Sequence, residues 1–292
     1  MRKIREIAIE KALLFSSLIT IAVTVGIVSV LAFEAFRFFS EVSIIDFFTD
    51  TQWTPLFTDK HYGILPLLSG TLLTSFIAIS VALPIGLSIS IYLSEYAPKS
   101  FRKTVKPLLE LLAAVPTVVY GFFALVVVTP FLQGIIPNLS GFNSLSAGIV
   151  MGIMIIPFVS SLSEDALHAV PTSLREASYG MGATKLQTAF KVAVPAASSG
   201  IIVSIILAIS RAIGETMIVA VAAGQQPRLT LDPTVPVETI TAYIVQVSLG
   251  DVQHDSIEYR TIFAAGITLF VFTFFLNTLS YRIRKKFQEK YE

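Results

Sequence analysis

Two opposite charges stand four residues apart in an otherwise apolar segment. The stretch SRAIGETMIVAVAAG carries Arg211 and Glu215 as its only charged residues. An ionisable side chain inside a membrane-spanning segment is costly and by default marks a functional site. Arginine presents a planar fork of N–H donors that suits tetrahedral oxyanions. The expected chemistry is therefore anion attraction by Arg211 along a transport pathway, with Glu215 holding the arginine or acting as a gate.

A structural role for the same two residues stays open. At i,i+4 spacing on one helix the side chains share a face, so Arg211 and Glu215 can form an ion pair. Alternatively, Arg211 can bond to a neighbouring helix. The sequence does not choose between these roles and the pathway.

Other chemistry is poorly supported by the residue types present. The chain has no cysteine, and its three histidines are too scattered to predict a metal site. It contains no G-x-x-x-x-G-K-[ST] phosphate loop, so we expect no nucleotide site and no cofactor in this chain. The net charge of +1 gives no field that would attract nucleic acid.

The composition determines the class of element that positions the two charges. Of 292 residues, 54% are hydrophobic and only 14% are charged, against roughly 25% charged in an average soluble domain. The apolar residues form long unbroken runs rather than alternating segments of about ten. We therefore expect an all-α polytopic membrane protein that forms one domain over residues 1–292.

Six stretches are long enough to span, because about 20 apolar residues cross the hydrocarbon core as a helix. They are residues 12–33, 66–93, 109–132, 143–162, 197–223 and 261–281. The third and fourth come from one charge-free run, 111–163, which the turn-forming QGIIPNLSGFN divides into a hairpin. The first is read as a retained helix and not a signal peptide, since no A-x-A-like site follows it.

The distribution of lysine and arginine predicts the orientation. With the N-terminus in the cytoplasm, sixteen of the 21 basic residues lie inside, four lie outside and Arg211 lies within a span. This orientation places both termini and the loop 163–196 in the cytoplasm, and the loops 34–61 and 224–260 outside. The two external loops are acidic, which fits either a solvated rim or a docking surface for an extracytoplasmic partner.

The cytoplasmic loop predicts two short helices. Pro171 suits a first helical turn, Ser173-x-x-Glu176 fits a capping box, and two glycines then end the helix. Thr184-x-x-Gln187 begins a second helix, on which Leu186 and Phe190 lie one turn apart. Such a pair can present an apolar knob to a partner's groove, or it can be a connection that packs on its own bundle.

The same loop resembles the EAA signature of ABC importer permeases, E-A-A-x3-G-x9-I-x-L-P. The matching residues are Glu176, Ala177, Ser178, Gly182, Val192, Ala193, Val194 and Pro195, with conservative departures at 178, 192 and 194. The resemblance implies the fold of a type I ABC importer permease. It also implies that this helix pair is a coupling helix, which inserts into a cleft of a cytoplasmic ATPase subunit.

A second resemblance is to permeases of phosphate-specific ABC importers, most closely the PstC type of subunit. It is carried by RAIGETM, SEYAP and ELLAAVP-x3-YG within residues 62–281. It implies transport of inorganic phosphate across a prokaryotic inner membrane, with Arg211 and Glu215 important for transport. The implied partners are a paralogous PstA-like permease, two PstB-like ATPases that bind ATP and magnesium, a PstS-like extracytoplasmic phosphate-binding protein and membrane lipid.

Three other functions remain in view. A permease for another oxyanion, such as molybdate or sulfate, fits the same residues. A secondary transporter could use Arg211 and Glu215 as a proton relay, but it would need no coupling helix. A membrane scaffold without transport would leave the paired charges without a role.

Overall fold

The computed structural model describes residues 2–287 of the chain, and the expected cytoplasmic charge Lys290 lies outside them. The described part is helical. It contains two isolated β-bridges, Trp53 with Tyr62 and Gly224 with Val237, and no β-strand beyond these bridges. The longer helices are α1 (Arg2–Phe39), α3 (Leu65–Ile91), α4 (Lys99–Ala113), α7 (Ser144–His168), α11 (Ser198–Ile213), α13 (Ile240–Leu249) and α14 (Ile257–Phe287). The shorter helical segments are α2 (Ile44–Thr49), η1 (Tyr92–Tyr96), α5 (Thr117–Phe123), η2 (Ala124–Val128), α6 (Thr129–Gln133), α8 (Thr172–Gly180), α9 (Lys185–Thr188), η3 (Ala189–Ala193), α10 (Val194–Ala196) and α12 (Met217–Ala222).

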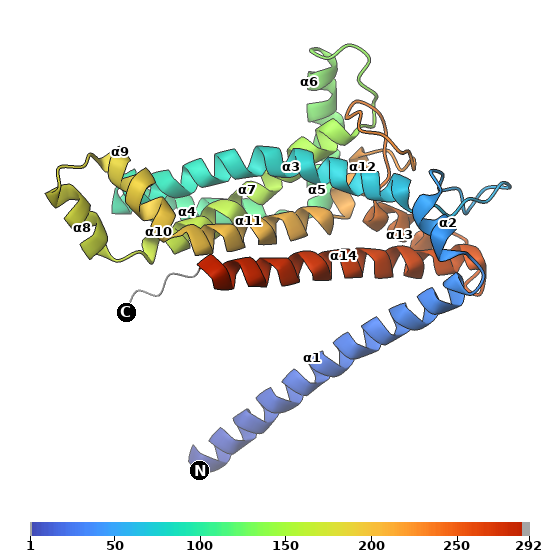
Figure 1. Ribbon diagram of the computed structural model, residues 1–292, viewed down its shortest axis with the longest axis horizontal. Coiled ribbons are helices and arrows are strands. Elements are labelled where there is room, and N and C mark those ends of the chain that lie inside the picture. The colour runs from blue at the N-terminus through green and yellow to red at the C-terminus, as the bar shows by residue number, and fades with distance from the viewer. Residues whose placement is uncertain (1, 288–292) are drawn as a thin grey trace.

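Within residues 2–287, four helices are long and apolar enough to cross a membrane. The number rises to six if each of two bent pairs is one span: Lys99–Ala113 with Thr117–Gln133, and Lys185–Ala196 with Ser198–Ile213. Helices α3, α7, α11 and α14 lie alongside one another in Figure 1. Helices α8 and α9 lie at one end of this bundle, which we call the α9 end, and α2 and α13 lie at the other, the α13 end (Figure 1). Helix α1 diverges from the bundle and leaves most of its apolar surface exposed.

The most extensive helix packing joins α3 to α7. It depends on two glycines of α7, because a Cβ at Gly152 would lie 2.7 Å from the carbonyl oxygen of Ala78, and a Cβ at Gly148 would lie 2.7 Å from the Cβ of Ile77. The two glycines, four residues apart, thus let the two helices approach closely, as small residues at this spacing commonly do in membrane helices. The largest cluster of buried apolar side chains extends from this contact to α5, α11 and α12.

A second core lies at the α13 end and is rich in aromatic rings. Phe38 of α1 packs edge-on against Phe47 of α2, with ring centroids 5.9 Å apart. Trp53 lies between Phe47 and Tyr243 of α13, at centroid distances of 6.1 and 5.0 Å. Edge-to-face contacts of this kind add to the burial of apolar area. They fix the loop after α2 against α13.

Four prolines in the expected spans have different effects on the helices. Pro66 occupies the first turn of α3 and so begins the helix, and Pro84 and Pro157 lie inside the continuous helices α3 and α7. Only Pro116 stands at a sharp bend. A proline within a span is expected to kink it, but Pro66 does not, because its missing N–H is not required at a helix start.

Candidate functional site

The third expected span, 109–132, is broken. Helix α4 ends at Ala113, α5 begins at Thr117, and the two directions differ by 85°. Pro116 accounts for the break, since it has no N–H to donate and pushes the preceding residue away from helical angles. The phenol of Tyr120 donates a hydrogen bond to the carbonyl of Leu112 at 2.8 Å and so provides a partner near the open end of α4.

The fifth expected span, 197–223, is broken as well. Helix α11 ends at Ile213 and α12 begins at Met217. Glu215 lies in the gap, and one of its carboxylate oxygens accepts hydrogen bonds from the backbone N–H groups of Met217 and Ile218 at 3.1 and 3.3 Å. A carboxylate at this position satisfies two of the unpaired N–H groups that begin a helix and complements the helix dipole.

Arg211 lies in the last turn of α11, on the exposed side of the subunit. Its guanidinium carbon stands 5.9 Å from the ring centroid of Phe158 on α7. Within the described residues, no ion pair joins Arg211 to Glu215. The hypothesis that i,i+4 spacing pairs them was wrong, because the helix ends at Ile213 and the carboxylate is bonded to the backbone of α12.

The helices that follow the two breaks pack against each other. Helix α12 packs against α5, and a Cβ at Gly121 would lie 2.9 Å from the Cβ of Val221 and 3.3 Å from the carbonyl oxygen of Met217. Glu215 is also tied to α13, since Thr241 donates a hydrogen bond to its backbone carbonyl at 2.7 Å. Interrupted helices of this kind, whose ends carry partial charges, commonly form the substrate sites of transporters.

The segment with the EAA-like spacing forms a helical hairpin at the α9 end (Figure 1). Helix α8 ends in a Schellman motif: the N–H of Ala183 bonds to the carbonyl of Ser178 at 3.1 Å, and the N–H of Gly182 bonds to that of Tyr179 at 2.9 Å. Gly182 has φ +82°, which a glycine adopts without a Cβ penalty. The spacing between residues 178 and 182 thus has a geometric reason.

The second arm of this hairpin begins with the capping box that the sequence predicts. Thr184 accepts from the N–H of Gln187 at 3.3 Å, and the Gln187 side chain accepts from the N–H of Thr184 at 2.9 Å. The other predicted box is wrong, because α8 begins directly after Pro171 and no side chain caps it. The two arms are joined by a hydrogen bond of 2.9 Å between the hydroxyls of Ser178 and Thr188.

The remaining residues of the EAA-like motif differ in exposure. Glu176, Ala177 and Pro195 are exposed, and Val192 and Val194 are partly buried next to the buried Ala193. Leu186 and Phe190 are 59% and 54% exposed, so this apolar surface does not pack on its own bundle. The structure thus favours the expected apolar knob over the alternative of a self-packed connection.

The anchor of this hairpin was not predicted from the sequence. Arg175 pairs with Glu95 of η1 at 2.9 Å, and its guanidinium also donates to the carbonyls of Leu167 and Val170 at 2.8 and 2.6 Å. Glu95 is 4% exposed in its side chain and Arg175 16%. These charge-assisted bonds fix the start of α8 to the end of the bundle. The SEYAP stretch contains Glu95, which is the one signal that could have indicated it.

The geometry is that of a membrane-embedded helical bundle with broken helices and a protruding helical hairpin. The family model of the binding-protein-dependent transport system inner membrane component matches residues 82–290. The chain belongs to this family. Both helix breaks and the whole hairpin lie within the matched residues, so the two candidate regions fall in the part that the family shares.

Named relatives extend the match over most of the chain. The chain is 35% identical over 260 residues to the probable ABC transporter permease protein YqgH of Bacillus subtilis, covering 88% of this chain and 84% of that protein. It is 35% identical over 250 residues to the phosphate transport system permease protein PstC of Xylella fastidiosa, covering 79% and 75%. The PstC of Mesorhizobium japonicum is 34% identical over 256 residues, covering 80% and 76%.

Solved structures give the same fold. A bacterial alginate ABC transporter, crystallised in complex with an alginate pentasaccharide-bound periplasmic protein, contains a chain that matches 94% of this one with a TM-score of 0.62 and 20% identity. An inward-facing structure of the MetNI methionine ABC transporter matches 78% with a TM-score of 0.57 and 21% identity. This family member is therefore a multi-pass membrane permease component with an ABC importer fold, as predicted.

Proposed function

We propose that this chain is a permease subunit of an ATP-driven importer for inorganic phosphate. The observation that carries the proposal is the similarity to phosphate transport system permeases over about four fifths of the chain, at 34 to 35% identity. The stretch RAIGETM leads into α12, and the stretch SEYAP contains Glu95, which anchors the hairpin. The segments that resemble phosphate permeases therefore have structural roles in this fold.

In this proposal Arg211 attracts the oxyanion at the break between α11 and α12. Its guanidinium lies on an exposed face and is not neutralised by Glu215, so it is available to a ligand. An anion beside it would lower the free energy of placing an arginine in a membrane. Glu215 has a positional role in this proposal, since its carboxylate caps the start of α12 and so stabilises the break between α11 and α12.

A paralogous permease completes the pathway, and an extracytoplasmic binding protein delivers phosphate to the α13 end. Two cytoplasmic ATPases bind ATP and magnesium and receive the hairpin of residues 172–196 through Leu186 and Phe190. Both termini lie in the cytoplasm. Movement of the hairpin on ATP binding then switches the pathway between inward and outward access.

The test is uptake by the reconstituted complex of all subunits. ATP-dependent uptake of labelled phosphate, with competition by arsenate and little competition by sulfate or molybdate, is the expected result. Competition by sulfate without arsenate would replace phosphate by another oxyanion. Uptake that persists without the ATPases would contradict an ATP-driven importer and favour a secondary transporter.

The role of Arg211 has its own test. Arg211→Gln should abolish phosphate uptake while the complex still assembles, because the side chain is exposed and supports no described ion pair. Arg37→Gln is the matched control, since Arg37 is a surface arginine in an i,i+3 pair with Glu34 and should leave uptake unchanged. Uptake at the wild-type rate in Arg211→Gln would refute the pathway role.

A further inference from the structure

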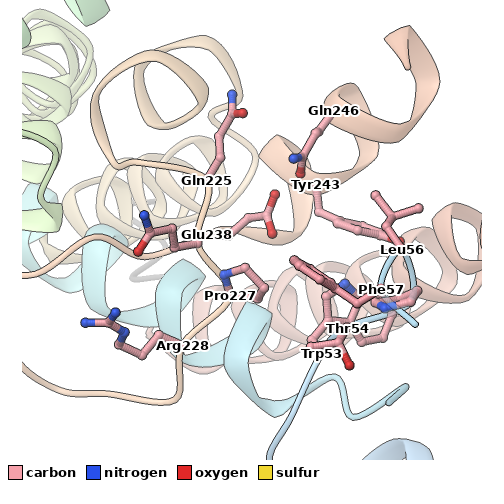
Figure 2. Close-up of a pocket in the computed structure, with 12 residues that line it drawn as sticks. Trp53, Thr54, Leu56, Phe57, Gln225, Pro227, Arg228, Glu238, Tyr243 and Gln246 are labelled. Atoms are coloured by element: carbon pink, nitrogen blue, oxygen red, sulfur yellow. The ribbon is translucent and has the colours of Figure 1, made fainter. Parts of the chain in front are cut away.

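A cavity of about 300 Å³ lies at the α13 end, on the opposite side of the bundle from the hairpin. Two loops form it together with α13: residues 53–57 after α2, and residues 225–228 after α12. Figure 2 shows the Glu238 carboxyl extending into the space between these loops and α13. We call it the Glu238 cavity.

Glu238 is buried with an unpartnered carboxyl oxygen. The residue is 1% exposed, and its Oε1 has no hydrogen-bond partner. A buried polar atom in this condition destabilises the fold unless something else satisfies it. Backbone packing accounts for the position of the residue, since a Cβ at Gly70 would lie 2.1 Å from the Glu238 carbonyl oxygen, but it does not account for a carboxyl there.

The walls of the cavity suit an organic cation. The rings of Trp53, Phe57 and Tyr243 line it, together with the amides of Gln225 and Gln246. Aromatic faces and a carboxylate attract ammonium and guanidinium groups, and amides complete their hydrogen bonds. A metal ion fits less well, because it needs several oxygen ligands and Glu238 is the one acidic side chain among the described residues that line the cavity.

In the part of the chain that the structure describes, no basic side chain that lines the cavity neutralises the Glu238 carboxyl. Arg228, on the loop after α12, is exposed, and its guanidinium points away from the carboxyl in Figure 2. Burial raises the pKa of the Tyr243 phenol, so that group from α13 is uncharged near neutral pH. The other residues that line the cavity are uncharged. Burial also raises the pKa of Glu238 to about 8, so without a cation the site holds a neutral acid at pH 7.

We propose that the Glu238 cavity receives the cationic end of a lysine or arginine side chain of the extracytoplasmic binding protein. The rim supports a protein partner over a free small cation, since Leu56 and Phe57 are 44% and 65% exposed there and add an apolar contact around the polar centre. The partner's identity rests on the proposed function; the preference of the cavity for a cation does not.

The cation site can be tested on the full chain alone in lipid nanodiscs. Trp53 is the single tryptophan of the chain and lines the cavity, so its fluorescence reports occupancy. Titration with ethylguanidinium or butylammonium at pH 8.5 should give a saturable change that sodium chloride at equal ionic strength does not. Binding requires the ionised carboxylate of Glu238, whose pKa is about 8, so affinity should fall roughly 50-fold between pH 8 and pH 6.

Glu238→Gln keeps the size of the side chain and cannot ionise, so it should keep the thermal midpoint and lose the saturable response. Asp251→Asn is the matched control, because Asp251 is an exposed acid two residues after the end of α13. An unchanged response in Glu238→Gln would overturn the site. A fluorescence change that follows pH alone, with no dependence on the cation, would show a proton switch and would overturn it equally.

The partner is tested on the reconstituted complex. Glu238→Gln should weaken binding of the binding protein at least tenfold at pH 8.5 and flatten its pH dependence, and Asp251→Asn should do neither. Cation binding by the isolated chain without an effect on docking would overturn the assignment to the binding protein. If the wild-type complex fails to import phosphate, the proposed substrate is wrong, and the fluorescence result still decides the cation site.

Discussion

Replacement of Gly182 by alanine tests whether the shape of the hairpin matters for coupling. Gly182 has φ +82°, and a Cβ there would meet no atom within 4 Å. The substitution therefore adds no clash, and its effect comes from the backbone angle alone.

The size of the effect follows from the left-handed conformation, which costs a residue with a Cβ about 1–2 kcal/mol. The hairpin is exposed around Gly182, so in the free subunit it can relax out of the Schellman motif. Docking would require the motif again, and the strain then appears as weaker docking. A loss of about 1–2 kcal/mol corresponds to roughly 5- to 30-fold in an equilibrium constant.

A matched control lies two residues earlier. Gly180 is the last residue of α8, and a Cβ there also meets nothing within 4 Å, but its φ is not positive. Gly180→Ala should stabilise the helix by about 0.5–1 kcal/mol, because alanine loses less backbone entropy than glycine. The two substitutions add the same methyl group to the same hairpin with opposite expected signs.

The assay is titration of the ATPase subunits against the permease pair, together with ATP-driven uptake. Gly182→Ala should raise the dissociation constant roughly 5- to 30-fold and lower uptake at limiting ATPase, and Gly180→Ala should do neither. Equal docking by wild type and Gly182→Ala would refute the reasoning. Equal weakening by both variants would show that the added methyl group, and not the angle, is responsible.

Three further outcomes are expected. Gly121→Ala should lower the thermal midpoint, since its Cβ would stand 2.9 Å from the Cβ of Val221, and such overpacking costs about 1–3 kcal/mol. Gly134→Ala is the control, because the nearest atom to its Cβ would lie 3.4 Å away. Equal midpoints in the two variants would contradict the close approach. Glu215→Ala should destabilise by about 0.5–2 kcal/mol through loss of the cap, and Glu215→Gln should recover most of it; equal loss in both would argue for a role of the charge. The side-chain hydrogen bond to Asp50 raises the pKa of His61 above 6.5. Its contribution to the stability of the loop is therefore present below pH 6.5 and is lost as the pH rises through the raised pKa. NMR titration of His61 should show a lower pKa in Asp50→Asn, and an unchanged pKa would contradict the pairing.

The fold class was predictable from the sequence because a soluble core cannot hide long charge-free runs, whereas a membrane requires them. The hairpin at the α9 end was predictable from local signals. The capping box at Thr184, the glycine at 182 and the exposed Leu186 and Phe190 are all confirmed. Such signals depend on a few neighbouring residues and do not need the rest of the chain.

The hypothesis of an ion pair between Arg211 and Glu215 was wrong because it used local spacing where contacts between distant segments decide. The i,i+4 rule assumes an unbroken helix, and glycine at 214 was not enough to indicate that α11 ends one residue earlier. What ends the helix is tertiary: Thr241 of α13 bonds to the Glu215 carbonyl at 2.7 Å, and α12 packs on α5. No local pattern contains these contacts.

The sequence by itself determined that this protein is a membrane bundle, where its helical hairpin lies and which two charges stand in its apolar part. Composition and short-range spacing decide those matters, since hydrophobic length and helix caps act over neighbouring residues. The tertiary structure alone decided that the helices after two span breaks, α5 and α12, pack together, that Arg175 anchors the hairpin to Glu95, and that Glu238 is buried with an unpartnered oxygen. Each of these depends on segments tens of residues apart, and only packing brings them into contact.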